Sequence, residues 1–218
     1  MALVQLDSKI SGSKGNTTWA KNKGGAYIRQ RSSPTNPNSA RQQVVRVELA
    51  QSALNWRALT EANRLAWREY ALAHPYTNRI GEEKTLSGNA MYNKLNCRVL
   101  DIALASLAAP PVYAAPGPLL TFTVVRASAT TATLTFTATP LPAGVRLQVW
   151  MSTPQNGQVN PNFRQTKLVG YTAAAAASGV VITLPIPWAV GQWCTFFAFT
   201  MDASGQLSAP LQYKVVGA

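Results

Sequence analysis

The side chains that most often carry chemistry are few and scattered in this sequence. The one histidine, His74, stands immediately before Pro75 at the expected end of a helix, where a helix-end role suits it better than catalysis. The only adjacent acids, Glu82-Glu83, fall in an expected loop, whereas acid–base catalysis needs converging, partly desolvated carboxylates. Gly12-Ser13-Lys14-Gly15 lacks the strand and helix that flank a phosphate-binding loop. We therefore expect no enzyme, no catalytic residue and no cofactor.

The two cysteines, Cys97 and Cys194, fall in different predicted domains, one on a helix and one on a strand. They are expected to be free buried thiols, and no Cys/His cluster has the spacing of a metal site. Residues 1–12 show no apolar run typical of a signal peptide, and no segment reaches the roughly 18–20 apolar residues of a membrane span. We therefore expect no metal, no membrane contact and synthesis in the cytoplasm.

The charge of the chain is its most unusual bulk property. It carries 20 Lys/Arg against 8 Asp/Glu, a formal charge of +12, with a pI near 10.2. Fifteen of the Lys/Arg and seven of the acids lie in residues 1–104, and the remaining five and one lie in residues 105–218, so both parts are basic. This surplus predicts an acidic partner, either nucleic acid or an acidic protein surface.

Residues 1–36 are rich in glycine and basic residues and poor in apolar ones. They hold six Lys/Arg against one acid, and their main apolar anchors are Trp19, Tyr27 and Ile28. So little apolar surface predicts an extended arm that is disordered alone and becomes ordered when it docks. The residues expected to meet the partner are Trp19, Lys21, Lys23, Tyr27, Arg29 and Arg31.

Two other readings of this arm stay open. It could be a solvated tail, although Trp and Tyr are typical of contact sites. It could also bind nucleic acid, because bases stack on aromatic rings and basic side chains neutralise phosphates. No recognisable nucleic-acid fold accompanies it, so nucleic acid is the second choice of partner.

Residues 37–104 predict a helical hairpin followed by a third helix. The capping residues Ser39, Thr60 and Ser87 each stand before a stretch with apolar residues at helical spacing. The helices are expected to end near Ala58, before Pro75 and at Leu104. The first two are joined by so short a turn that they should pack as an αα-hairpin.

Three aromatic residues mark the apolar stripes of this hairpin: Trp56, Trp67 and Tyr70. They are the expected helical foot of the protein. Their spacing favours packing inside the helical unit for the two tryptophans, and contact with a partner is the alternative.

From Leu119 onward the hydrophobic period changes from 3.6 to 2, which indicates half-buried strands. The preceding residues 105–118 hold four prolines and read as an extended linker. Seven strands in about a hundred residues are typical of an immunoglobulin-like or fibronectin type III sandwich. They are expected near residues 119–126, 130–138, 145–152, 163–171, 179–185, 192–201 and 208–216.

The segment 202–210, DASGQLSAP, resembles the last hairpin of bacterial fibronectin type III domains. If that resemblance sets the register, Cys194 and Phe196 face the core, and a bulky row faces outward as a protein interface. The candidate interface residues are Trp150, Trp193, Phe197 and Phe199. A register shifted by one residue would instead place the bulky row in the core.

The expected fold class is therefore multidomain α and β. It comprises an extended N-terminal arm (1–36), a small helical hairpin or three-helix unit (37–104), a Pro/Ala-rich linker (105–118) and a seven-stranded antiparallel β-sandwich of fibronectin III or Ig-like type (119–218).

An ordered series of motifs over residues 12–98 resembles a group of tailed-bacteriophage and prophage proteins. It runs through Ser13-Lys14-Gly15, Trp19, Tyr27-Ile28-Arg29, Pro34-x-Asn36-Pro37, Gln42-Gln43, Arg46, Trp56, Leu59-Thr60, Arg64, Trp67, Tyr70-Ala71, Asn78, Gly81 and Ser87-Gly88-x-x-Met91-Tyr92-x-x-x-Asn96. The resemblance implies a virion structural protein with no catalytic residues to transfer. Its implied partners are the major capsid, portal/adaptor or tail-fibre proteins and further copies of itself.

On that resemblance, the arm and foot would attach the protein to capsid or neck/tail as a cement, decoration or fibre-attachment subunit, and the sandwich would be displayed. A carbohydrate or cell-surface binding module of a tail fibre is an alternative. It would need an aromatic platform on the sandwich, for which Trp150, Trp188 and Trp193 are the candidates.

Overall fold

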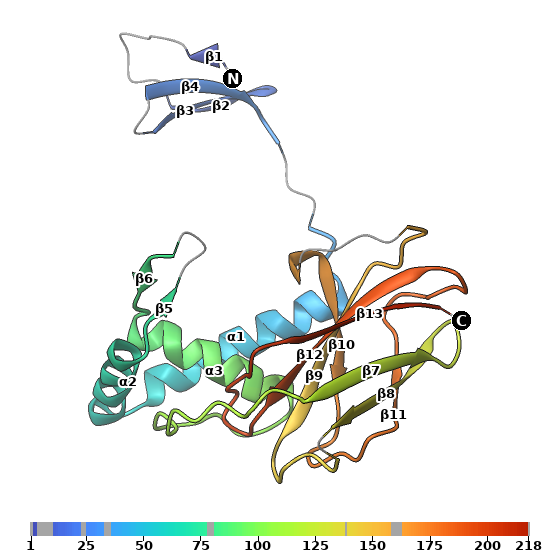
Figure 1. Cartoon of the computed structure of the whole chain (residues 1–218). Helices are drawn as coiled ribbons and strands as arrows, with labels where there is room; N and C mark the ends of the chain where they lie inside the picture. Colours follow the sequence, from blue (N-terminus) through green and yellow to red (C-terminus); the bar gives the residue numbers. More distant parts are fainter. Residues whose placement is uncertain are drawn as a thin grey trace. The chain divides into compact units, whose positions relative to one another are not determined.

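The computed structural model describes residues 2–3, 11–22, 25–32, 36–77, 81–137, 139–157 and 163–217. The chain forms two compact units, Met1–Gln43 and Val44–Ala218, which are described in turn (Figure 1). Both contain antiparallel sheet, and the helices belong almost entirely to the second unit.

The N-terminal unit is a four-stranded antiparallel sheet in the order β1-β4-β3-β2. Its strands are β1 (Ala2–Leu3), β2 (Gly12–Lys14), β3 (Thr17–Asn22) and β4 (Gly25–Gln30). Strands β2 and β3 are joined by the two-residue turn Gly15-Asn16, where Gly15 has φ +58°. This conformation suits glycine, and a Gly-Asn pair between two strands is a hairpin signal.

This sheet corrects the expectation of an extended arm without a fold of its own. Too little apolar surface for a core does not prevent strand pairing, because the pairing satisfies backbone hydrogen-bond groups by itself. The unit is nevertheless a single layer: none of its described residues from 11 to 43 is buried. It therefore has ordered strands but no hydrophobic core.

The second unit begins with three helices, as the sequence predicts: α1 (Ala40–Ala58, whose first residues belong to the N-terminal unit), α2 (Glu61–Ala73) and α3 (Gly88–Asp101). The predicted caps are confirmed. Ser39 Oγ accepts the Gln42 N–H at 3.4 Å, and Thr60 and Ser87 accept the N–H groups of Asn63 and Ala90. Two short strands, β5 (Tyr76–Thr77) and β6 (Glu83–Lys84), pair between α2 and α3.

Helix α3 ends at Asp101, three residues before the predicted end. Ala103 has φ +56°, its N–H bonds to the Leu100 carbonyl, and the Leu104 N–H bonds to the Val99 carbonyl. This is the left-handed helix stop that usually carries glycine. Because alanine occupies the position, the sequence shows no stop signal there.

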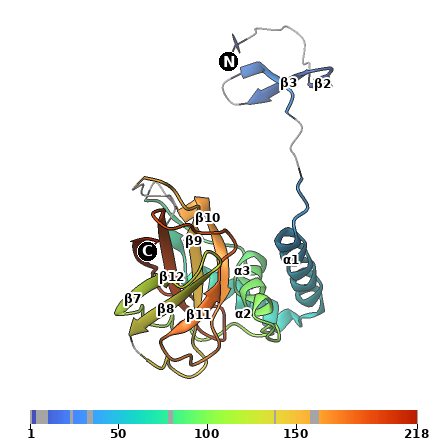
Figure 2. The same ribbon diagram turned by 90° about the vertical axis from the view of Figure 1, so that its right-hand side faces the viewer.

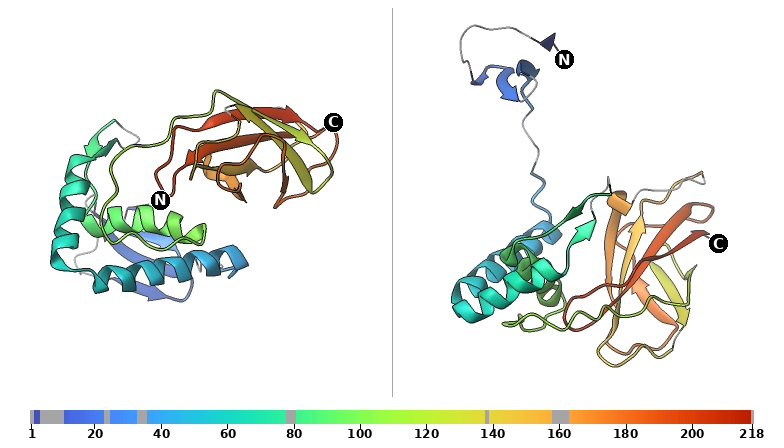
Figure 3. Two further views of the ribbon diagram at one scale, coloured as in Figure 1. Left: turned by 90° about the horizontal axis from the view of Figure 1, so that it is seen from below. Right: turned by 60° about the vertical axis from the view of Figure 1, so that its left-hand side comes forward.

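The helices share a small core of their own, built around Trp67, Ala71, Met91, Tyr92 and Leu95. The Tyr92 ring lies 5.3 Å from that of Trp67 and 5.2 Å from that of Trp56, measured between centroids. The hairpin is therefore held by a third helix whose tyrosine contacts both tryptophans. Figure 3 shows α3 alongside α1.

Residues 104–120, here called the strap, contain no helix or strand and lead from α3 to the strand that begins at Thr121. Four side chains hold the strap backbone. The side-chain oxygen Oδ1 of buried Asn96 accepts the Leu107 N–H at 2.6 Å, and Trp67 Nε1 donates to the Ala108 carbonyl at 2.9 Å. Gln206 bonds both the Val112 carbonyl and the Ala114 N–H, and Thr200 Oγ1 donates to the Gly117 carbonyl.

The remaining strands form two antiparallel sheets, ordered β11-β8-β7 and β10-β9-β12-β13. Each overlaps one of the segments predicted as strands. They are β7 (Thr121–Arg126), β8 (Thr131–Thr137), β9 (Arg146–Ser152), β10 (Thr166–Tyr171), β11 (Val180–Thr183), β12 (Trp193–Met201) and β13 (Leu211–Val216). A single hydrophobic core contains residues of both sheets, among them Val124, Leu134, Leu147, Val149 and Phe196.

Helix α3 connects the helices to the four-stranded sheet (Figure 2). The Tyr171 hydroxyl of β10 donates to the Asp101 carboxylate at 2.6 Å and accepts from Gln148 Nε2 at 2.8 Å. Arg98 Nη1 donates to the Gly205 carbonyl in the turn before β13. A Cβ on Gly205 would lie 2.7 Å from the Leu95 carbonyl oxygen, so this turn rests directly on the helix backbone.

Candidate functional site

The N-terminal sheet collects most of the predicted docking residues. Cross-strand partners share a face, so Trp19 and Ile28, which are paired, lie on one side of the sheet. Lys21 is two residues from Trp19 and Lys14 lies two residues from Gly12, which pairs with Trp19, so both lysines belong to this same face. This Trp19 face is therefore an aromatic–aliphatic pair flanked by two lysines.

The opposite face carries the other predicted pair, Tyr27 and Arg29, and Arg31 follows directly after β4. The backbone N–H of Arg31 bonds to the Asn16 carbonyl at 2.8 Å and extends the pairing. Lys23, the sixth predicted residue, lies outside the described residues. The sequence analysis did not predict the sheet that divides these residues between two faces.

The basic charge of this sheet is not balanced by acidic residues in the same stretch of sequence. Residues 11–32 contain five Lys/Arg and no Asp or Glu. Trp19, Tyr27 and Ile28 are each half-buried, because one layer of sheet can cover only part of them. A basic, single-layer sheet with partly covered aromatic residues has the composition of a surface that meets an acidic partner.

The predicted helical foot is mostly interior. Trp67 is fully buried, Trp56 is half-buried against Tyr92, and Tyr70 packs edge-on to Trp67 at 5.7 Å. The structure thus gives Trp67 the intramolecular role that its spacing favours. It cannot also contact a partner.

Helix α1 carries aliphatic residues that stay exposed. Only its C-terminal part is covered, where Ser52 is buried and bonds to Asn93 of α3 at 2.7 Å. Val45 and Leu49, which lie on the same helical face as Ser52, are 42% and 50% exposed, and Val44, Val47 and Leu54 are exposed as well. Helical spacing in the sequence cannot show that this part of the face is left uncovered.

The predicted sandwich interface is an aromatic cluster on the outer side of the four-stranded sheet. Cys194, Phe196 and Ala198 of β12 face the shared core, which leaves Trp193, Phe197 and Phe199 on the other side. Phe163 lies over this side, with its ring 5.3–5.5 Å from the rings of Trp150, Phe197 and Phe199. Because of this cover, Phe197 is only 7% exposed.

We expect two phenylalanines of this cluster, Phe197 and Phe163, to respond differently to truncation. Phe197→Ala removes a buried ring and should lower the free energy of unfolding by about 3 kcal/mol, whereas Phe163→Ala, at a ring 40% exposed, should cost about 1 kcal/mol. Urea denaturation of both variants measures the difference. Equal losses would mean that Phe163 is as much a part of the core as Phe197.

The candidate carbohydrate platform does not exist as three exposed tryptophans. Trp188 is fully buried in the core shared by the two sheets, packs 5.6 Å from Phe196 and donates from Nε1 to the Gln192 carbonyl. Trp150 is half-buried under Phe163, and Lys214 Nζ lies 5.9 Å from the ring centroid of half-buried Trp193.

Among the residues that the structure describes, no group of three or more His, Cys, Asp or Glu is placed to hold a metal ion. Both cysteines are free, as predicted, and Cys194 is buried, but Cys97 is only half-buried, which corrects the expectation that both are buried. Burial raises the pKa of the Cys194 thiol to about 11 and also raises the pKa of Cys97, so both are neutral thiols at pH 7. No helix in the described part of the chain is long and apolar enough to cross a membrane.

Comparison with known proteins gives a distant structural match over part of the chain. No protein-family model matches the sequence, and no curated protein matches it. Among solved structures, the fibronectin type III domain of human fibronectin type III domain containing protein 3 is similar, with 11% sequence identity and a TM-score of 0.28. The match covers 50% of this chain and 94% of that one.

Proposed function

We propose that this protein is a non-enzymatic structural subunit of a tailed-phage virion. It attaches through its N-terminal sheet to an acidic site on capsid or neck/tail proteins and presents its sandwich as a decoration, cement or fibre-attachment domain. Its partners are the major capsid, portal/adaptor or tail-fibre proteins and further copies of itself. The assignment of this protein to a virion rests on the motif series over residues 12–98.

The observation that carries the proposal is the N-terminal sheet. It has order without a core, since none of its described residues from 11 to 43 is buried. Residues 11–32, which include β2, β3 and β4, hold five Lys/Arg and no Asp or Glu in the sequence. Docking on an acidic protein surface supplies both the missing second layer and the missing counter-charge.

The second unit supports the role of a displayed, rigid piece. The strap is held by Asn96, Trp67, Gln206 and Thr200, and α3 is bonded to the sandwich through Arg98 and Asp101. A subunit that must place a domain at a fixed position on a particle benefits from such a connection. A freely moving tether would not fix that position.

We propose further that β7–β13 form a sandwich of the fibronectin type III kind. Three strands in one sheet and four in the other, all antiparallel and sharing one core, are what this class of fold requires. Such domains serve many functions, so the fold supports display and contact without naming the partner.

The test is attachment to particles. In phage that carry this gene, the wild-type protein should be present in purified virions at a fixed ratio to the portal, as measured by quantitative mass spectrometry. The double variant Trp19→Ala/Lys21→Ala should be depleted at least about tenfold, because it loses the aromatic anchor and one flanking charge of the Trp19 face. Lys167→Ala, which removes an exposed lysine from β10, is the control and should attach normally.

Two outcomes would contradict this proposal. Absence of the wild-type protein from particles would reject the structural role. Normal attachment of the Trp19/Lys21 variant would reject the sheet as the attachment site. If the protein instead binds DNA, with affinity that falls steeply as salt rises, the same basic sheet serves nucleic acid.

A further inference from the structure

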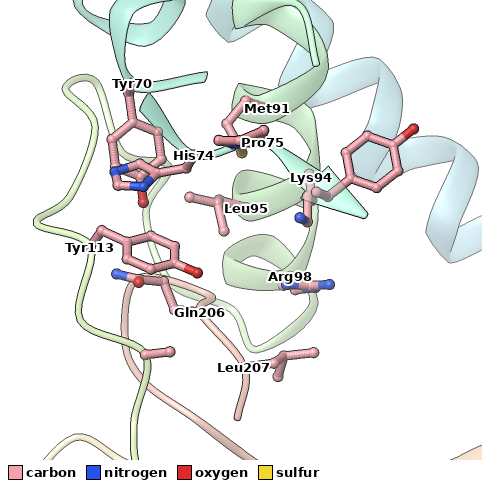
Figure 4. A pocket seen from close by; sticks show the side chains of 12 residues that line it. Tyr70, His74, Pro75, Met91, Lys94, Leu95, Arg98, Tyr113, Gln206 and Leu207 are labelled. Atoms are coloured by element: carbon pink, nitrogen blue, oxygen red, sulfur yellow. The ribbon is translucent and has the colours of Figure 1, made fainter. Parts of the chain in front are cut away.

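A pocket of about 220 Å³ lies within the second unit, where four separate segments meet. The end of α2 supplies Tyr70 and His74, α3 supplies Lys94 and Arg98, the strap supplies Tyr113, and the turn before β13 supplies Gln206. Figure 4 shows these side chains around one space, with Leu95 of α3 between the aromatic and the basic sides. The pocket is separate from the N-terminal sheet and from the outer aromatic cluster.

One wall of the pocket is an aromatic stack. The rings of His74 and Tyr113 are nearly parallel, 4.1 Å apart between centroids with an interplanar angle of 13°, and Tyr70 meets His74 edge-on at 4.6 Å. In Figure 4 the Tyr113 hydroxyl points toward the side on which Lys94 and Arg98 lie. This wall offers a flat apolar surface that ends in a polar group.

The opposite wall is basic. Lys94 and Arg98 are four residues apart on α3, so they stand on the same face as like charges one turn apart. The pocket lining contains these two cations and no Asp or Glu. Within the described residues, Lys94 Nζ has no hydrogen bond or ion pair, and Arg98 Nη1 bonds to a neutral carbonyl, that of Gly205.

The surroundings make this charge costly in the empty pocket. Burial lowers the pKa of Arg98, and burial together with the nearby Arg98 charge lowers the pKa of Lys94, although Lys94 as a whole residue is exposed. The pKa of Tyr70 is raised mainly by burial, then by the nearby Tyr113, and then by the charge of Asp202. Its carboxylate, however, accepts hydrogen bonds from the Ser204 hydroxyl and from the N–H groups of Ser204 and Gln206.

We propose that this pocket binds an oxyanion, a carboxylate or a phosphate, carried on a flat or apolar body. Lys94 and Arg98 meet the anionic group, and the body packs against the ring of Tyr113 and the side chain of Leu95. The same chemistry could come from an acidic side chain or chain terminus of a protein partner, or from a free small molecule. The site is independent of the attachment role of the N-terminal sheet.

The test compares benzoate with benzamide, which has the same shape and no charge, by titration into the isotope-labelled full-length protein followed by NMR. Benzoate should bind with a Kd on the order of millimolar, as suits so small a ligand, and should shift the amides of Leu95, Tyr113 and Gln206. Benzamide should bind at least about tenfold more weakly, because it cannot pair with the cations.

Lys94→Gln is the informative variant, since Lys94 has no partner in the described structure whose loss would disturb the fold. It should weaken benzoate binding by about tenfold, and Lys167→Gln on β10, which removes the same charge elsewhere, should leave binding unchanged. Equal affinity for benzoate and benzamide, or full benzoate affinity in Lys94→Gln, would overturn the proposal.

Two further titrations identify the source of the oxyanion. Tighter binding of a glutamate residue blocked at both ends than of phosphate supports the proposal with a polypeptide as the natural ligand. Tighter binding of inorganic phosphate supports it with a phosphate-bearing small molecule. Shifts confined to exposed lysines far from the pocket, with either probe, would contradict it.

Discussion

Trp67→Ala should lower the free energy of unfolding of the second unit by about 3–5 kcal/mol, the largest loss expected from any single substitution in the helical core. Trp67 is fully buried and its ring contacts those of Tyr70 and Tyr92. Alanine would leave a cavity between α2 and α3. It would also remove the donor that Nε1 presents to the Ala108 carbonyl of the strap.

Chemical denaturation followed by circular dichroism measures this loss. Trp67→Phe keeps a ring in place but cannot donate to Ala108, so it should fall between the wild type and Trp67→Ala. Leu72→Ala is the control on the same helix, because Leu72 is 66% exposed, and it should cost less than about 0.5 kcal/mol. A loss below about 1 kcal/mol for Trp67→Ala would show that the helical core is not organised around this residue.

Gly205→Ala should destabilise the protein by about 2–4 kcal/mol, for two reasons that can be separated. Its backbone has φ +78°, which costs a residue with a Cβ about 1–2 kcal/mol. In addition, the new Cβ would lie 2.7 Å from the Leu95 carbonyl oxygen, a backbone atom that cannot move away cheaply. The turn before β13 would have to separate from α3.

Gly191→Ala isolates the first reason, and its difference from Gly205→Ala gives the second. Gly191 has φ +79°, almost the same backbone angle, but nothing lies within 4 Å of the Cβ that alanine would add. It should therefore lose only the conformational part, about 1–2 kcal/mol, in the same denaturation experiment. If the two variants lose the same amount, close contact between the turn and α3 does not contribute to stability.

The starts of the helices could be predicted closely because they depend on local side-chain hydrogen bonds. Ser39, Thr60 and Ser87 begin them as capping residues do, and the hydroxyl of each accepts a backbone N–H. The end of α3 could not be placed, since Ala103 adopts the left-handed conformation without a glycine to announce it. Tertiary contacts of the strap with Asn96 and Trp67 hold it there, and these do not appear in local sequence.

The N-terminal sheet was not predicted, although its sequence does contain a local signal for a hairpin. The turn Gly15-Asn16 between alternating residues is a hairpin signal, yet the shortage of apolar residues favoured an extended arm. The burial of the outer side of the four-stranded sheet was harder to predict. Period 2 distinguishes the two faces of β12 but cannot show that Phe163, more than thirty residues earlier, covers the outer one.

The oxyanion pocket had no counterpart in the sequence. His74 is predicted at a helix end, and it does lie there. Its stacking on Tyr113 depends on the course of the strap, which the sequence does not show. Lys94 and Arg98 have a spacing that is ordinary for basic residues on one face of a helix, and the site depends on the turn before β13 lying beside them. A site made by four segments meeting in space leaves no motif in any one of them.

The strap also gives the protein a reserve of length that is not accessible at rest. Its residues 104–120 would span roughly 60 Å if pulled straight. Under tension, the bonds from Asn96, Trp67, Gln206 and Thr200 would have to break before that length is released. A particle that used this subunit as a mount would therefore have a stiff attachment at low force and an extensible one beyond a threshold.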